Sequence, residues 1–163
     1  MGPELQIDSQ SASEMRDVCL TTCHVMKIHS DSMIRAEAIK CLQELHLFAS
    51  KYVKLENLVP YLLDSLVSKD FLLRKVAISC LRQLCQKDSR DVCRIAAEHV
   101  KRASPIGLLS LIGERGLECL LFKMLDIETN PYLIRDVHDI LNGLLCTLLD
   151  EFTLKEWLFL CRC

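Results

Sequence analysis

Ten cysteines and five histidines are the side chains of this chain that are best suited to chemistry. Thiolates bind zinc or act as nucleophiles, and imidazoles bind metals or transfer protons. A structural zinc site needs four convergent ligands, commonly supplied by Cys-x-x-Cys pairs, and the chain contains no such pair. Cys19 and Cys23 lie four residues apart with His24 beside them, which supplies only part of a site. A thiol-based metal or redox module is therefore kept as the weaker alternative.

No arrangement of residues typical of an active site accompanies these side chains. The histidines are scattered and form no His-Glu-x-x-His motif. The glycines Gly113 and Gly116 flank Glu114 and Arg115, without the lysine and the preceding strand that a phosphate-binding loop requires. We therefore predict no catalytic residue, no cofactor and no metal, and a protein that is not an enzyme.

Basic residues gather in the middle of the chain and could bind an acidic partner. Residues 74–102 carry 8 basic and 3 acidic groups, whereas the segments on either side are acidic. Arg90, Arg94 and Lys101 recur near one face of an expected helix, with Arg102 beside them, so these four form the candidate partner-contact patch. The stretch has no Phe, Tyr or Trp to stack on bases, which argues against nucleic acid. A solvated helix face is the alternative.

The composition predicts an all-α protein. Half of the 163 residues are apolar but only 6% are aromatic, and 5 Gly and 4 Pro are too few for the tight turns of a sandwich or barrel. The first residues show no basic region followed by an apolar run, so we expect a cytoplasmic chain with reduced thiols. No charge-free stretch approaches the roughly 18 apolar residues of a membrane span.

Start and stop signals divide the chain into a disordered lead-in and a series of helices. The lead-in is polar and Ser-rich over residues 1–12, and Pro60 is expected near the first turns of its helix, where a missing N–H costs least. The predicted helices cover residues 13–28, 33–48, 55–67, 70–86, 89–102, 117–125, 132–149 and 154–163, with a further short helix at 108–112.

An internal repeat is the main organisational feature. Sliding the chain by 39 residues superposes residues 35–45 on residues 74–84. Identical residues coincide at six of these positions, among them Arg35 on Arg74 and Cys41 on Cys80. A weaker third copy places Arg135 on Arg74 at an offset of 61. The preceding helices also align, with Leu58 over Leu117 at an offset of 59. Each unit is thus expected to be a helical hairpin, and Cys41 and Cys80 to be small buried side chains between helices.

A period of about 40 residues with two helices per unit is typical of HEAT and armadillo arrays. Pro60, the Leu73-Arg74 pair, Ala77 and Leu81 resemble the HEAT consensus. The Asp that HEAT repeats carry six residues before the Arg is missing, since His29, Ser68 and Thr129 occupy those positions. Arg35, Arg74 and Arg135 are therefore predicted to bond carbonyls at the ends of neighbouring helices instead.

Several segments resemble one family more closely. LQELHLFA (42–49), LVPYL (58–62), LLRKVAISCLRQL (72–84) and WLFLCR (157–162) resemble the central part of the large HEAT repeat-containing protein 5 family. The resemblance covers about residues 33–163. It implies a fragment or short isoform of a long cytosolic solenoid, acting as a non-catalytic scaffold in clathrin-adaptor traffic between the trans-Golgi network and endosomes. It also implies adaptor accessory proteins, such as aftiphilin and gamma-synergin, as partners.

The predicted architecture is an all-α HEAT-type α-solenoid of about three antiparallel hairpins over residues 13–163. The hairpins cover approximately 13–49, 55–87 and 115–150, with a linking helix at 89–102 and a terminal helix at 154–163. The predicted function is protein–protein interaction in vesicle traffic, on the cytoplasmic side of endosome or trans-Golgi membranes and without a membrane span. A HEAT adaptor for nuclear transport or a phosphatase is the alternative with the same fold. The apolar ends are expected to meet further repeats or a second copy.

Overall fold

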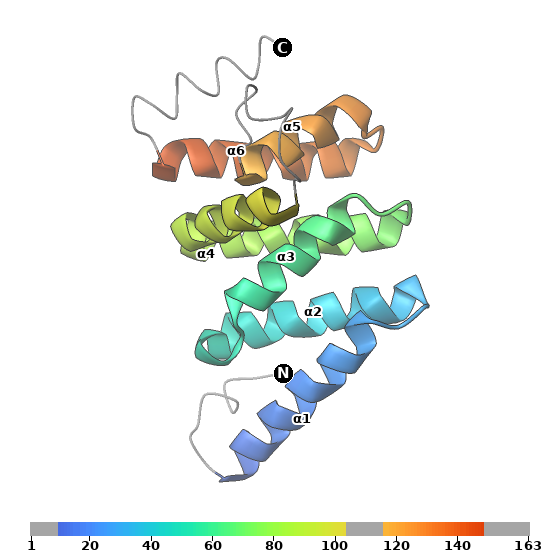
Figure 1. Cartoon of the computed structure of the whole chain (residues 1–163), viewed down its shortest axis with the longest axis vertical. Helices are drawn as coiled ribbons and strands as arrows, with labels where there is room; N and C mark the ends of the chain where they lie inside the picture. Colours follow the sequence, from blue (N-terminus) through green and yellow to red (C-terminus); the bar gives the residue numbers. More distant parts are fainter. Residues whose placement is uncertain (1–9, 104–115, 149–163) are drawn as a thin grey trace. The chain divides into compact units, whose positions relative to one another are not determined.

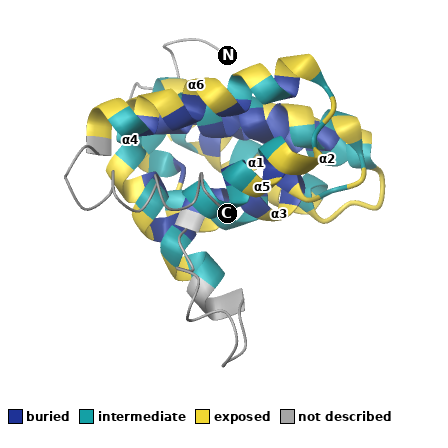
Figure 2. Cartoon of the chain, turned by 90° about the horizontal axis from the view of Figure 1, so that it is seen from above, coloured by how far each residue is buried: buried dark blue, intermediate teal, exposed yellow. Residues whose placement is uncertain are grey.

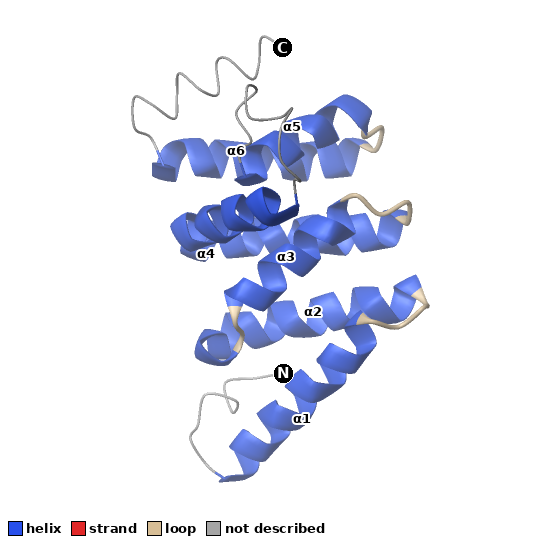
Figure 3. Ribbon diagram, in the orientation of Figure 1, coloured by secondary structure: helices blue, strands red, loops and turns tan. Residues whose placement is uncertain are grey.

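The chain is all-helical in a computed structural model, which describes residues 10–103 and 116–148 apart from the side chains of 101–103, 116 and 148 (Figure 1). The elements are α1 (Gln10–Lys27), α2 (Ser32–Ala49), the short 3-10 helix η2 (Ser50–Tyr52), α3 (Leu55–Leu66), α4 (Phe71–Ala103), α5 (Gly116–Ile127) and α6 (Pro131–Leu148). Within these ranges there is no strand, and short loops join the helices (Figure 3). The predicted all-α class is confirmed for this part of the chain.

Four predicted helices match α2, α3, α5 and α6 to within two residues at either end. Helix α1 begins at Gln10, three residues before the predicted start, so the end of the predicted lead-in is helical. The remainder of that lead-in, the short helix at 108–112 and the terminal helix at 154–163 lie outside the described residues.

Helix α4 joins two segments that the sequence predicts as separate helices. The break falls at Asp88, whose φ of −132° and ψ of 44° are not helical. Aspartate disfavours helix interiors because its side chain competes for nearby backbone groups. The predicted boundary between residues 86 and 89 is therefore a kink inside α4 rather than a loop.

Pro60 is the sixth residue of α3, the same position that it has in the predicted helix at 55–67, and it lies past the first turn, where a missing N–H costs least. A proline there cannot donate to the carbonyl four residues earlier, that of Glu56. Buried leucines lie on both sides of it, Leu58 at 2% and Leu62 at 0% exposure. The apolar face of α3 thus continues past the missing hydrogen bond.

Two compact units make up the chain, Met1–Cys80 and Leu81–Cys163, and their boundary falls inside α4. In the first unit α1 packs against α2, and in the second α5 packs against α6 (Figure 1). Burial follows helical spacing, so that α6 has a buried side and an exposed side (Figure 2). The most deeply buried large side chains are Ile39, Leu45, Leu58, Leu62, Leu73, Ile78, Leu81, Leu84, Leu117, Leu121, Leu133 and Ile140.

The second helix of each predicted hairpin begins with the same cap. Asp31 Oδ1 accepts from the Met33 N–H at 2.8 Å, and Asp70 Oδ1 accepts from the Leu72 N–H at 2.9 Å. Asn130 Oδ1 accepts from the Tyr132 N–H at 3.0 Å. Such caps satisfy backbone donors that the first helical turn leaves unpaired.

These caps correct the register of the third copy. Asp70 and Asn130 are 60 residues apart, and the same offset pairs buried residues at several positions of the helix: Leu73 with Leu133, Ala77 with Val137, Leu81 with Leu141, and Leu84 with Leu144. The predicted offset of 61 instead pairs buried Leu84 with the half-buried Leu145. The offset of 61 aligns Arg135 with Arg74 and pairs the buried Val76 with the buried Val137, but it matches fewer buried positions than the offset of 60 does.

Candidate functional site

Three thiols lie close together in the first unit, where α1 packs on α2. Burial, reinforced by a hydrogen bond with Cys41, raises the pKa of Cys23 to about 12, and Cys19 also contributes to the rise. A thiol with so high a pKa stays protonated at neutral pH and is a poor nucleophile and metal ligand. The chemistry that this cluster supports is therefore packing between α1 and α2.

Two further thiols also have a raised pKa. Burial raises the pKa of Cys80 and that of Cys93 to about 12. Cys80 is fully buried and Cys41, its counterpart in the repeat, is half-buried, so the predicted packing role applies to Cys80 more completely. Among the described residues no group of three or more His, Cys, Asp or Glu side chains is placed to hold a metal ion.

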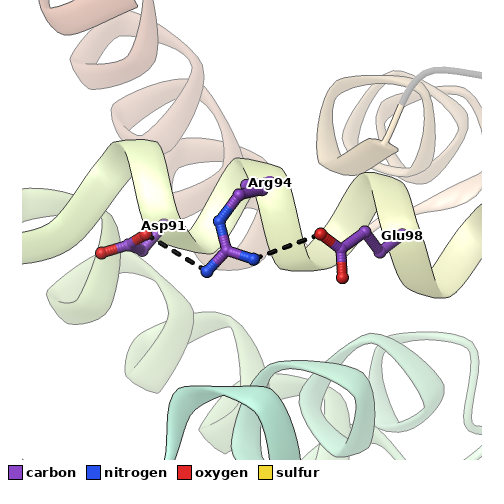
Figure 4. A network of polar contacts seen from close by, with 3 residues as sticks. All are labelled: Asp91, Arg94 and Glu98. Atoms are coloured by element: carbon purple, nitrogen blue, oxygen red, sulfur yellow. Dashed lines mark hydrogen bonds and ion pairs between the residues drawn. The ribbon is translucent and has the colours of Figure 1, made fainter.

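One member of the candidate patch on α4, Arg94, is paired with two acidic side chains of the same helix (Figure 4). Arg94 Nη2 lies 3.3 Å from Asp91 Oδ1, and its Nη1 lies 3.2 Å from Glu98 Oε1. The hydrogen bond with Asp91, and to a smaller extent the one with Glu98, raises the pKa of Arg94. Arg90 is exposed, while the side chains of Lys101 and Arg102 lie outside the described residues.

Arg82, another basic residue of the 74–102 segment, is partly exposed and contacts α6. Its Nη1 lies 3.2 Å from Asp139 Oδ2 and 3.7 Å from Asp136 Oδ1. Side chains at positions three apart on a helix share a face, so α6 presents both carboxylates to one guanidinium. The positive charge of Arg82, one of the basic residues at 74–102, is thus balanced by carboxylates within the second unit.

The three repeat arginines have different surroundings. Arg74 Nη1 donates to the carbonyls of Ser68 and Lys69, each at 3.1 Å, in the loop that follows α3. The charge of Arg35 adds to the hydrogen bond from Ser32 that lowers the pKa of Asp70, and it opposes the rise in the pKa of Tyr61 that burial causes. Arg135 is exposed, with its guanidinium 5.9 Å from the ring centroid of Tyr132. Arg74 thus bonds two carbonyls of the loop between α3 and α4 rather than the last residues of a neighbouring helix, and Arg135 lies one position away from the equivalent site.

A groove in the first unit is the site that the sequence did not reveal. It has a volume of about 390 Å³ and is lined by residues of α1, of α2, of η2 with the loop after it, and of α3. The lining residues are Leu20, Thr21, His24, Lys27, Leu42, Tyr52, Val53, Lys54, Asn57 and Leu58. Contributions from four separate segments leave no local motif, although a lysine at the N-cap of α3, where Ser or Asp is usual, is a weak signal.

Aromatic rings hold cations around this groove. Lys27 Nζ lies 4.6 Å from the ring centroid of Tyr61, whose hydroxyl donates to the Lys27 carbonyl at 3.2 Å. The guanidinium of Arg16 lies 4.1 Å from the ring centroid of Tyr52, and Lys51 Nζ lies 4.8 Å from the same centroid. Contacts of this kind stabilise cations near apolar surface. They hold the cationic groups of Arg16, Lys27 and Lys51 against the rings of Tyr52 and Tyr61.

The comparisons with known proteins give no family for the chain. Among the described helices, none combines the length and apolar character needed to cross a bilayer. No family model matches the sequence, and no solved structure matches the chain.

Proposed function

We propose that the chain is a non-catalytic protein–protein interaction scaffold built as a HEAT-type α-solenoid. The observation that carries this proposal is the recurring helix with an Asx cap, which is followed by buried side chains at matching positions after 39 and then 60 residues. The first spacing is that of a HEAT repeat, in which each hairpin packs against the next, and the second is longer because the C-terminal half of α4 intervenes.

The chemistry of the cysteines and of the basic patch supports a scaffold rather than an enzyme. Removal from water raises the pKa of the Cys23, Cys80 and Cys93 thiols to about 12, and Arg94 is held between two carboxylates. Neither group is prepared to activate a nucleophile or to stabilise a developing charge. The first unit instead presents a groove lined by apolar and basic side chains, which suits binding to another protein.

The pathway proposed for this scaffold is clathrin-adaptor traffic between endosomes and the trans-Golgi network, and it rests on the resemblance of residues 33–163 to the HEAT repeat-containing protein 5 family. The partners would then be the clathrin adaptor and its accessory proteins aftiphilin and gamma-synergin. Recruitment by these partners would place the chain on the cytoplasmic face of those membranes.

Affinity purification of the tagged full chain from cultured cells, followed by quantitative mass spectrometry, tests this function. Enrichment of the adaptor and of aftiphilin or gamma-synergin over a tag-only control is the expected result. Enrichment of nuclear-transport factors or of phosphatase subunits in their place would overturn the proposed pathway while retaining a scaffold. Failure to enrich any protein would overturn the scaffold itself.

A further inference from the structure

The groove in the first unit has an apolar floor and a rim that opens to solvent. Leu42 and Leu58, on α2 and α3, are 7% and 2% exposed, and Val53 is 6% exposed. On the rim, His24, Lys54 and Asn57 are exposed. At about 390 Å³ the groove has room for the side chains of a short peptide but not for a folded domain.

The charge of the groove has one sign. Lys27 and Lys54 line it together with His24, and no Asp or Glu is among its lining residues. The other cations nearby, Arg16 and Lys51, are held by the ring of Tyr52, which itself lines the groove. A ligand that complements these residues must carry negative charge at its edges and an apolar group at its centre.

Lys27 adds a reason to expect a carboxylate. Its burial lowers the pKa of the ammonium group, because removal from water disfavours the charged form. A carboxylate placed beside the Lys27 ammonium would offset that loss of solvation. Lys54 is exposed and reaches the same groove from the start of α3, so the two cations can hold two acidic residues of one segment.

We propose that this groove binds a short acidic segment of a partner protein, which inserts an aliphatic or aromatic side chain against Leu20, Leu42 and Leu58 and sets carboxylates beside Lys27 and Lys54. The inference rests on the proposed scaffold function and gives it a binding surface on unit 1. The α4 patch is less suited to such a ligand, since Asp91 and Glu98 already occupy Arg94.

A labelled short peptide, with two leucines and a phenylalanine among Asp and Glu residues, is titrated with the full chain by fluorescence anisotropy. The control peptide has Asn and Gln in place of the acids. Lys54→Glu should weaken binding about five-fold, since reversing one exposed charge changes about 1 kcal/mol. Glu beside a helix N-terminus is also favourable, so this variant is expected to keep its fold. Thr21→Trp should fill the groove and weaken binding by at least about ten-fold.

Lys75→Glu is the matched control, because Lys75 is exposed on α4 and does not line the groove. It should bind the acidic peptide as the unaltered chain does, with circular dichroism verifying that all variants are folded. Equal binding of the acidic and amide peptides, or unchanged binding by both Lys54→Glu and Thr21→Trp, would overturn the inference. A dimer that sediments without peptide and is lost in Thr21→Trp would show that a second copy occupies the groove, which also overturns it.

The proposed function and the groove fail separately in these experiments. A chain that enriches adaptor proteins from cells but does not bind the acidic peptide keeps its function and loses the groove as a peptide site. A chain that binds the peptide through Lys54 but enriches none of those proteins keeps the groove and loses the proposed pathway.

Discussion

The start of α4 and the start of α6 are capped in the same way but are joined to their preceding loops by different side chains. Asp70 and Asn130 each accept two backbone N–H groups of the first helical turn. At α4, Arg74 then reaches back to the carbonyls of Ser68 and Lys69. At α6, Glu128 Oε1 accepts from the N–H groups of Thr129 and Asn130 instead, each at 3.1 Å.

Helix geometry explains the difference. Arg74 is the fourth residue after its cap and Arg135 the fifth. One residue turns a side chain by about 100° around the helix axis, so Arg135 points away from the loop that Arg74 reaches. Both arginines still lie near an aromatic ring three residues earlier, Phe71 at 6.0 Å and Tyr132 at 5.9 Å. A local pair can therefore recur in sequence without occupying the same place in the repeat.

Truncation of core leucines should give the largest effects and test the register that relates the two helices. Leu84→Ala and Leu144→Ala, at 1% and 0% exposure, should each cost about 3 kcal/mol in the free energy of unfolding. Leu145→Ala, at a half-buried position, should cost about 1 kcal/mol. Equilibrium urea unfolding followed by circular dichroism measures all three. A larger loss for Leu145→Ala than for Leu144→Ala would restore the offset of 61.

The caps should give the next largest effects. Asn130→Ala removes the acceptor of two N–H groups and should cost about 1 kcal/mol. Asp70→Ala should lower the thermal midpoint further than Asn130→Ala does, because Asp70 Oδ2 also accepts from the Ser32 hydroxyl of α2. Thermal unfolding of the two variants side by side makes the comparison, and an equal or smaller shift for Asp70→Ala would show that the Ser32 bond adds nothing.

Truncation of Arg74 and of Arg135 should change the free energy of unfolding by less than loss of a cap does. Arg74→Ala leaves two loop carbonyls without their donor and should cost about 0.5–1 kcal/mol, a value reduced by the partial exposure of the site. Arg135→Ala should change the free energy of unfolding by less than about 0.3 kcal/mol, because the residue is exposed. Urea unfolding decides between them, and equal losses would mean that the carbonyl contacts of Arg74 carry no net stability.

The all-α class and the helix starts could be predicted from sequence because their signals are local. Apolar spacing predicts the buried faces, and Asp31, Asp70 and Asn130 stand next to the segments that they cap. The kink at Asp88 illustrates the limit of such signals, because the same residues are compatible with a loop or with a bend in one helix. Only packing of the chain on either side decides between the two.

The candidate sites were harder to predict, because the charge around a basic residue and the residues that line a groove both depend on neighbours in space. The basic count of residues 74–102 does not show that Arg82 meets carboxylates of α6, 54 and 57 residues away along the chain. The partners Asp91 and Glu98 of Arg94 could have been inferred from their three- and four-residue spacing. The groove could not, since Lys27 and Lys54 become neighbours of one cavity only after α1, α2 and α3 have packed.

The pH dependence of stability should give the smallest effect. It distinguishes the two caps because Asp70 can be protonated and Asn130 cannot. The hydrogen bond from Ser32, with the N–H groups of Leu73 and Leu72 and the charge of Arg35, lowers the pKa of Asp70 below its ordinary 3.8. A lowered pKa stabilises the folded state above the unfolded pKa, and this contribution is lost as the pH falls through the folded value. The difference in thermal midpoint between the unaltered chain and Asp70→Asn should therefore be constant from about pH 7 to 5 and shrink below about pH 4.

Asn130→Asp provides the reciprocal test of this difference. It gives α6 the carboxylate cap of α4, where the N–H groups of Tyr132 and Leu133 would bind the charged form. The pKa of the new carboxyl should also be lowered, so the variant should gain a stabilising contribution at neutral pH that disappears in the same acid range. Thermal unfolding of Asn130→Asp against the unaltered chain, from about pH 7 to 3, measures it. A midpoint difference that does not change with pH would show that the partners of the cap, rather than its charge, distinguish α4 from α6.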